Sequence, residues 1–461
     1  MRRIVLAVAL ASLLTALGAC SKKDKDIDPP ATLADFPATL RVQRAWDANV
    51  GGKGDKLRLG LGVAIDDGRA FAAGHKGEVA AWDVQTGKSL WETKTKASLS
   101  GGTGAGQGLV AVGSSDGALI ALNAKDGSER WRVKLNGEVL SAPEIAPQAV
   151  LVRTVDGKLH ALALDTGREI WQYEQPSPRL TLRGTAKPVV IGETVICGFD
   201  NGKVVALNIP DGSLVWESTI GSAHGRTELE RLVDIDSAVR VVQDNVYVVG
   251  FQGRVAMLAL DSGQIWWAQD ASSYRGLAAD DDNVYVSTAE GDVIALKRAT
   301  GVEVWRQKGL AHRGLSAPVV LDKTVAVADF KGYVHWLDKT TGAFAGRAEA
   351  GGDRVSNPPV AAGDRVLVIN DDGKITAFKT SPITLASAAS APKAKPKADG
   401  ERLETGVPES MQRRGPPSPS EPIERPAAPS AEAAPALPAA AEPAPSATAP
   451  AEPAPSPPPP Q

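Results

Sequence analysis

The sequence predicts an all-β protein, an eight-bladed β-propeller that is closed by a strand from its N-terminal part. Three observations predict this fold. A pattern of about 40 residues recurs eight times, each copy contains several short alternating apolar segments, and a lone strand-like segment precedes the first copy. The part of the chain between the leader and the proline-rich end, residues 41–380, is long enough to bury a large core.

Glycines and tryptophans set the repeat. The opening glycines are followed ten residues later by a second glycine in seven copies, and a tryptophan stands four residues further on in six. The copies open at Gly77, Gly117, Gly157, Gly202, Gly253, Gly291, Gly332 and Gly373, in steps of 40, 40, 45, 51, 38, 41 and 41 residues. The six tryptophans are Trp91, Trp131, Trp171, Trp216, Trp267 and Trp305. Because they share one position in the repeat, we expect them to pack each blade on its neighbour rather than to form a ligand cage.

Each copy holds about four strands of two-residue period, joined by glycine turns, which is the content of one propeller blade. The eighth copy ends after Phe378 without its last strand, and residues 41–47 resemble that missing strand. We therefore predict a propeller over residues 41–380 in which residues 41–47 complete the last blade and remove an open sheet edge. The seventh copy has Phe344 and Gly346 near the expected tryptophan position, which predicts a weaker junction.

The first 19 residues predict a signal peptide, since a basic start precedes a 14-residue apolar run that is too short to span a membrane. The run ends in Leu17-Gly18-Ala19-Cys20, which resembles the bacterial lipobox and implies a lipid on the Cys20 thiol. An ordinary signal peptide with a chance cysteine is the alternative. Residues 20–40 are then a lipidated N-terminus and linker, and Ser21 in place of Asp implies an outer-membrane location facing the periplasm.

The C-terminal part, residues 381–461, holds 21 of the 33 prolines and many alanines. Such a composition cannot bury enough apolar surface to fold, so it predicts a disordered tail. A passive spacer is the main interpretation, and a contact with another envelope component is the second.

Other function classes find little support. The net charge gives no general attraction to nucleic acid, and two cysteines cannot form a disulfide framework. The histidines lack zinc-site spacing, and the glycine-rich residues 101–106 lie between strands rather than before a helix, which favours a flexible connection over a phosphate loop. Cys197 lies in an apolar strand and is expected to be buried. We expect no catalytic residue, metal or cofactor.

Two repeats are longer than the others, and long loops of a propeller often gather on its binding face. The first excess surrounds Leu180, Leu182 and Arg183, and the second surrounds Asp234 and Asp236. We expect these neighbouring loops to form one patch that contacts another protein, with arginine as a frequent hot-spot residue. Alternatively, Arg183 pairs with Asp234 or Asp236 and only braces the loops.

The repeats resemble those of quinoproteins more than WD repeats. Quinone-dependent dehydrogenases are thus the enzymatic alternative, but they are longer and typically carry a vicinal Cys-Cys pair, which is absent from this sequence. With the lipobox, Leu180-Thr181-Leu182-Arg183-Gly184 and residues 227–236, the chain resembles the BamB family of the outer-membrane β-barrel assembly machinery over about residues 20–380. That resemblance implies a non-enzymatic scaffold that binds the periplasmic POTRA domains of BamA and aids insertion of outer-membrane proteins, with unfolded outer-membrane proteins as possible further partners. It also implies that the five loop residues contact BamA.

Overall fold

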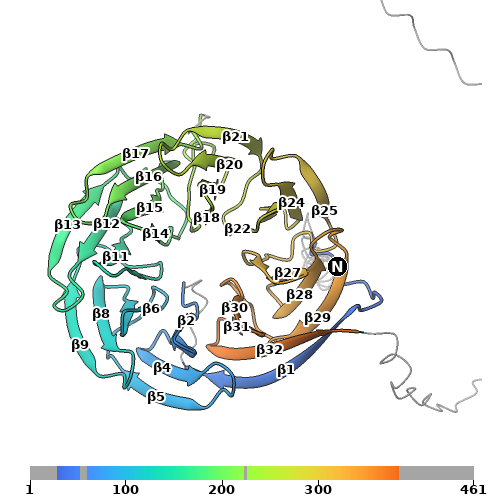
Figure 1. The fold of residues 1–461 in the computed structure, drawn as a ribbon, viewed down its shortest axis with the longest axis horizontal. Coiled ribbons are helices and arrows are strands. Elements are labelled where there is room, and N and C mark those ends of the chain that lie inside the picture. Colours follow the sequence, from blue (N-terminus) through green and yellow to red (C-terminus); the bar gives the residue numbers. More distant parts are fainter. Residues whose placement is uncertain (1–28, 52–59, 223–225, 384–461) are drawn as a thin grey trace, which may run out of the picture. The chain divides into compact units, whose positions relative to one another are not determined.

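The computed structural model describes residues 29–51, 60–222 and 226–383. The predicted signal peptide, Cys20 and nearly all of the predicted tail lie outside this part of the chain. Every named element within it is a β-strand, and the strands form eight four-stranded antiparallel sheets. The predicted eight-bladed propeller is therefore confirmed, and Figure 1 shows the blades arranged as a ring.

The blades follow one another along the chain, and each is a meander of four strands. The first four blades are β2 (Ala64–Asp66), β3 (Arg69–Ala73), β4 (Glu78–Asp83) and β5 (Ser89–Lys94); β6 (Gly104–Gly106), β7 (Leu109–Gly113), β8 (Ala118–Asn123) and β9 (Glu129–Lys134); β10 (Glu144–Ile145), β11 (Val150–Arg153), β12 (Lys158–Leu162) and β13 (Glu169–Glu174); and β14 (Val189–Ile191), β15 (Thr194–Gly198), β16 (Lys203–Asn208) and β17 (Leu214–Thr219).

The other four blades repeat this order, and in Figure 1 the first strand of each blade lies toward the centre of the ring. They are β18 (Arg240–Val242), β19 (Asn245–Val249), β20 (Arg254–Ala259) and β21 (Ile265–Asp270); β22 (Leu277–Ala279), β23 (Asn283–Ser287), β24 (Val293–Lys297) and β25 (Glu303–Gln307); β26 (Val319–Val320), β27 (Thr324–Ala328), β28 (Tyr333–Asp338) and β29 (Phe344–Glu349); and β30 (Val360–Ala362), β31 (Arg365–Ile369) and β32 (Lys374–Pro382) with β1 (Leu40–Asn49). The middle strands are almost wholly buried, so the core lies between adjacent blades.

The repeated tryptophans join each blade to the next one, as predicted. Trp91 donates a hydrogen bond from Nε1 to the Ala124 carbonyl, at 3.0 Å, and its ring covers Gly127 in the turn that follows. A Cβ atom at Gly127 would stand 2.5 Å from the indole, and φ there is +74°. The turn glycine is therefore required twice, for its backbone conformation and for the close approach of the ring. The other five tryptophans make the same bond to the next blade.

Closure of the ring follows the predicted route. β1 pairs with β32 in the eighth sheet, so a strand from the start of the described chain completes the last blade (Figure 1). Trp46 on β1 occupies the tryptophan position of that blade and donates to the Val84 carbonyl at 2.9 Å. At the seventh blade, Phe344 stacks on Phe36, with ring centroids 5.3 Å apart. This aromatic contact with the N-terminal residues thus lies two residues before Gly346, which stands opposite Trp336 at the position of the missing tryptophan.

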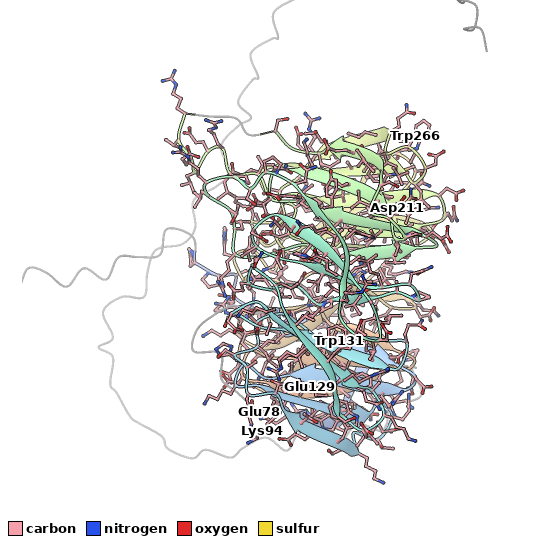
Figure 2. All side chains as sticks on the ribbon, turned by 90° about the vertical axis from the view of Figure 1, so that its left-hand side faces the viewer. Glu78, Lys94, Glu129, Trp131, Asp211 and Trp266 are labelled. Carbon is pink, nitrogen blue, oxygen red and sulfur yellow. The ribbon has the colours of Figure 1, made fainter. Side chains whose placement is uncertain are left out.

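Antiparallel pairing gives the ring two different faces. One, which we call the connection face, carries the turns between the second and third strands and the links between blades. The other, the hairpin face, carries the remaining turns. Side-on, Glu78 and Lys94 lie toward the connection face at the left, and Asp211 toward the hairpin face at the right (Figure 2).

Two smaller expectations can also be compared with the structure. Cys197 is buried, and burial raises the pKa of its thiol to about 12, so it is an unreactive core residue. The glycine-rich residues 101–106 were expected to be a flexible connection, which is wrong for their second half. Gly104–Gly106 form β6, and Gly101, Gly102 and Thr103 are buried, because small residues allow close approach to neighbouring backbone.

Candidate partner-binding loops

The two long loops are links between blades on the connection face. Residues 175–188 join β13 to β14, and residues 220–239 join β17 to β18, so they flank the fourth blade on either side. The backbone N–H of Leu182 donates to Asp234 Oδ2, and a Cβ atom at Gly184 would stand 2.9 Å from the Asp236 carboxyl. The structure thus places the two loops in direct contact, as the sequence predicted.

Only part of the predicted patch faces solvent. Leu180 is 41% exposed, Arg183 is exposed, and Leu182 is partly buried. Asp234 is buried to 1% exposure, and Asp236 is partly exposed but has a fully enclosed Oδ1. The leucines and the arginine therefore supply the accessible surface of the patch, while the aspartates lie beneath and beside it.

Arg183 does not pair with either aspartate. Its guanidinium forms two hydrogen bonds with Glu138, at 2.9 and 3.3 Å, and Glu138 lies in the link between β9 and β10 of the preceding blades. The predicted brace to Asp234 or Asp236 is therefore wrong. The reason is geometric, because those carboxyls point into the loop interior, where they meet Leu182 and Gly184.

A small buried charge cluster supports these loops. Arg153, at the end of β11, donates from Nη2 to Asp200 Oδ1 at 3.0 Å and lies over the Phe199 ring at 4.2 Å. Asp234 and Asp236 complete the cluster, which thus has three carboxyls and one guanidinium. Within the described residues, Oδ1 of both Asp234 and Asp236 and the Arg153 Nε find no hydrogen-bond partner. Such an arrangement disfavours having all three carboxyls ionised together.

The carboxyl pKa values reflect this surplus of buried negative charge. Burial raises the pKa of Asp236 to about 8, and the charges of Asp234 and Asp200 add to the shift. Burial likewise raises the pKa of Asp234 to about 7, although the Leu182 N–H opposes this. Near neutral pH, Asp234 and Asp236 are therefore partly protonated in the folded protein. Ordinary aspartates in the unfolded chain would be ionised at the same pH.

These shifts predict a loss of stability between about pH 4 and pH 8. Over that window the two carboxyls bind more protons in the folded protein than in the unfolded chain, so their contribution to the free energy of unfolding falls as pH rises. Asp236→Asn cannot ionise. We expect the variant to melt near the wild-type temperature at pH 5 and several degrees above it at pH 8.5, in thermal scans. Asp270→Asn, at a side chain that is 96% exposed, is the control and should show no such divergence. Parallel curves for wild type and Asp236→Asn would contradict the buried acid.

Sequence reasoning missed one accessible residue of the second loop. Leu229 is 67% exposed, the most exposed large apolar side chain among the described residues. It stands in a turn held by reciprocal bonds between Thr227 and Glu230, whose backbone and side chains cap each other. The threonine and glutamate three residues apart were the available signal, since a capping pair fixes the turn and presents the residue between them.

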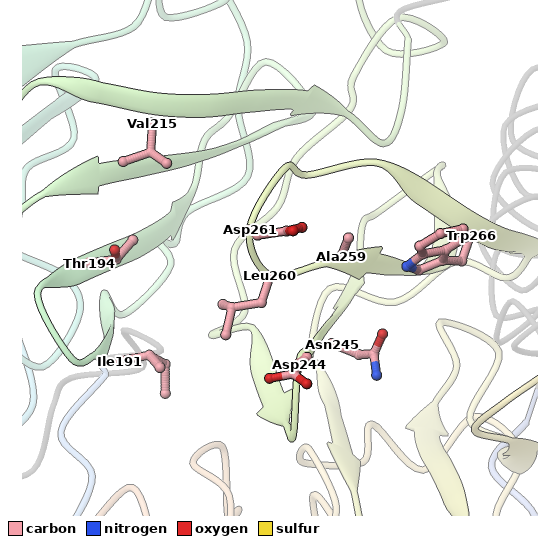
Figure 3. Close-up of a pocket in the computed structure, with 9 residues that line it drawn as sticks. All are labelled: Ile191, Thr194, Val215, Asp244, Asn245, Ala259, Leu260, Asp261 and Trp266. Carbon is pink, nitrogen blue, oxygen red and sulfur yellow. The ribbon is translucent and has the colours of Figure 1, made fainter.

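A groove, but no metal-binding cluster, is found among the described residues. In the described ranges no group of three or more His, Cys, Asp or Glu side chains is arranged to hold a metal ion. A groove of about 520 Å³ on the hairpin face lies between the fourth and fifth blades, with Trp266 at one end and Asp244 and Asp261 beside Leu260 (Figure 3). Its nine lining residues include no histidine, cysteine, lysine or arginine.

A family model and several relatives match most of the described propeller. The model of a family described as Outer membrane protein assembly factor BamB matches residues 42–100, 75–307 and 290–382, which together span nearly all of the propeller. The chain belongs to the BamB family. BamB of Pseudomonas aeruginosa is 45% identical over 371 residues, which cover 80% of this chain and 97% of that protein. BamB of Kangiella koreensis is 41% identical over 364 residues, covering 79% and 93%.

Solved structures of other proteins match the propeller fold. The crystal structure of BamB from Moraxella catarrhalis matches with a TM-score of 0.68 and 29% identity, covering 74% of this chain and all of that one. A quinohemoprotein alcohol dehydrogenase from Comamonas testosteroni matches with a TM-score of 0.59 but only 14% identity, covering 79% and 78%. The dehydrogenase shares the propeller alone. No described helix has the length and apolar character needed to cross a membrane.

Proposed function

We propose that this protein is a non-enzymatic scaffold of the outer-membrane β-barrel assembly machinery, held to the outer membrane by a lipid on Cys20 and facing the periplasm. Residues 20–40 are its lipidated linker, residues 41–380 its propeller and residues 381–461 a disordered tail. Membership of the family named as an outer membrane protein assembly factor is the observation that carries this proposal. The quinone-dependent dehydrogenase is the less favoured alternative, since it shares only the fold.

The partner in this proposal is the periplasmic POTRA region of BamA, which binds the two long loops. Leu180, Leu182 and Arg183 form the accessible surface, since Leu180 and Arg183 are exposed and Leu182 is partly exposed. Asp234 acts as a positioning residue because it accepts the Leu182 N–H, and Asp236 packs against Gly184 beside it. Unfolded outer-membrane proteins are possible further partners, and no cofactor is required.

Leucine truncation tests the surface. We expect Leu180→Ala combined with Leu182→Ala to weaken binding to purified BamA POTRA domains by about thirtyfold or more, because a hot-spot residue contributes about 2 kcal/mol. Titration calorimetry with a melting curve for each variant measures both effects. Ile170→Ala is the matched control, since Ile170 on β13 is 43% exposed but lies away from the loops. Unchanged affinity of the double variant would remove this surface from the proposal.

The same binding experiment distinguishes a direct contact of Arg183 with the partner from an effect of its ion pair with Glu138. The Arg183–Glu138 pair is solvent-accessible on the arginine side, at 44% exposure, so it contributes little to stability. If Arg183 contacts the partner, Arg183→Ala weakens binding whereas Glu138→Ala does not. Equal losses from the two variants would instead assign Arg183 a purely structural role.

A further inference from the structure

Residues 29–39, which we call the N-terminal strap, lie on the seventh blade before β1 begins. Backbone bonds hold the strap at both ends, from the Ala31 N–H to the Ala311 carbonyl at 2.9 Å and from the Thr39 N–H to the Ala345 carbonyl at 3.0 Å. Two arginines of the blade bind its carbonyls between these points, Arg313 at Ala31 and Arg347 at Ala34. The segment is thus a docked part of the propeller.

Apolar and aromatic contacts add to these bonds. Phe36 stacks on Phe344 at 5.3 Å, and the Arg347 guanidinium lies 5.0 and 5.4 Å from the two ring centroids. Leu33 packs against the core cluster that contains Leu310. The seventh copy differs from the regular repeat at Gly346, which stands at the tryptophan position, and at Phe344, two residues earlier. Phe344 supplies the aromatic surface on which the strap lies.

Asp329 and His335 hold the side chains of Arg313 and Arg347 in position. The buried Asp329 carboxylate accepts from Arg313 Nε at 2.7 Å and from His335 Nε2 at 3.1 Å. His335 Nδ1 in turn accepts from Arg347 Nε at 3.2 Å, which requires a neutral ring. Burial lowers the pKa of His335, in agreement with this state. Donors with fixed positions bind a strap with little further loss of side-chain entropy.

The position of the docked strap determines the face of the propeller from which the N-terminal part of the chain leaves. Ala311 belongs to the link between β25 and β26, and such links lie on the connection face, which also carries the two long loops. Nine residue steps separate Cys20 from Pro29, so the docked strap limits their distance to about 30 Å. A free chain as far as Thr39 would allow about 65 Å.

We propose that the N-terminal strap orients the propeller on the bilayer, holding the connection face near the seventh blade against the phospholipid headgroups that carry the anchor. This inference rests on the proposed lipid at Cys20. The two long loops then face the membrane side of the periplasm, and the groove beside Trp266 on the hairpin face is directed away from it.

Energy transfer to the bilayer tests the orientation. The lipidated full-length chain is placed on vesicles of phosphatidylethanolamine and phosphatidylglycerol that contain acceptor-labelled lipid, with a donor dye on Lys331→Cys or Thr340→Cys. These exposed residues stand at opposite ends of β28, Lys331 on the connection face and Thr340 on the hairpin face. The ends of β28 are about 20 Å apart, so we expect at least about twofold higher transfer from position 331. The buried Cys197 should not take up dye.

Releasing the strap provides the second comparison. Leu33→Ser with Phe36→Ser removes both apolar contacts, and we expect the difference between positions 331 and 340 to disappear while the protein stays on the vesicles. In the same variant, hydrogen exchange at the Ala31 and Thr39 amides should be about tenfold faster or more than in the wild type. Ala38→Ser, at an exposed strap position, is the control and should change neither result.

The outcomes separate the two proposals. Equal transfer from both positions in a vesicle-bound wild type would overturn the orientation but leave the anchor intact. Failure of the wild-type chain to stay with the vesicles, as expected only for Cys20→Ala, would overturn the anchor and with it this inference. A strap that exchanges as fast in the wild type as in the double variant would show that it is not docked in solution and would also overturn the proposal.

Discussion

Deleting residues 40–49 should make the propeller aggregate. β1 pairs with β32 at nine positions, from Leu40 opposite Pro382 to Asn49 opposite Lys374. Its removal exposes the hydrogen-bonding edge of β32 and uncovers the apolar cluster between the first and eighth blades, which includes Trp46, Trp82 and Leu367. An open, apolar strand edge is a template for pairing with other chains. The soluble fraction after expression and size-exclusion chromatography measures the effect.

A single substitution gives a graded version of the same test. Trp46 is 9% exposed, donates to the Val84 carbonyl and covers Gly87. Trp46→Ala should therefore cost about 3 to 5 kcal/mol of folding free energy. Trp266→Ala is the matched control, because Trp266 is 58% exposed and should cost far less. A soluble deletion variant with an unchanged melting temperature, or equal effects of the two tryptophan changes, would show that β1 does not close the ring.

Much of this fold could be predicted because its signal is repeated. One contact, an indole over the turn glycine of the next blade, imposes the same spacing of Gly and Trp at seven of the eight junctions, as at Trp91 and Gly127. Seven copies of a weak local pattern are together specific. The closing strand could also be predicted, since a meander that lacks its fourth strand at one end and has a spare strand at the other has a simple completion.

The loops were only partly predictable, because their contacts join residues from different blades without any fixed spacing. Excess length located both loops, and their contact through Leu182 and Asp234 confirms that they are neighbours. Arg183 pairs with Glu138, 45 residues earlier. This pairing depends on how far each link projects from its blade, and the repeat pattern of the sequence does not give that distance. For the same reason the burial of Asp234 could not be read from a polar, loop-like sequence.

The docked strap was not predicted for a different reason, because the residues that signal it interrupt the repeat instead of following it. Phe344 and Gly346 interrupt the repeat and predicted only a weaker junction between blades. In the structure Phe344 stacks on Phe36, which is more than 300 residues away in the chain. A departure from the repeat thus marks a surface that another segment of the chain covers.

Arg153→Ala should be among the most destabilising single changes outside the blade junctions. Arg153 is fully buried, pairs with Asp200 at 3.0 Å and stacks on Phe199. Removing it leaves three buried carboxyls without a cation, and loss of one partner of a buried pair costs about 3 to 5 kcal/mol. Burial already raises the pKa of Asp200, and Arg153 opposes that shift. We therefore expect a large fall in the melting temperature, and one that grows from pH 5 to pH 8.5 as the carboxyls ionise.

A second substitution distinguishes the charge from the packing. In Arg153→Met with Asp200→Leu neither buried charge of the pair remains, so most of the lost stability should return. Lys134→Ala is the control, because the Lys134–Asp116 pair is 61% and 66% exposed and contributes at most about 1 kcal/mol. Since Asp234 holds the Leu182 backbone within the same cluster, Arg153→Ala should also weaken BamA binding, whereas the double variant should restore it in parallel with stability. Recovery of stability without recovery of binding would mean that the ion pair itself, and not only a neutral and well-packed support, sets the position of the loops.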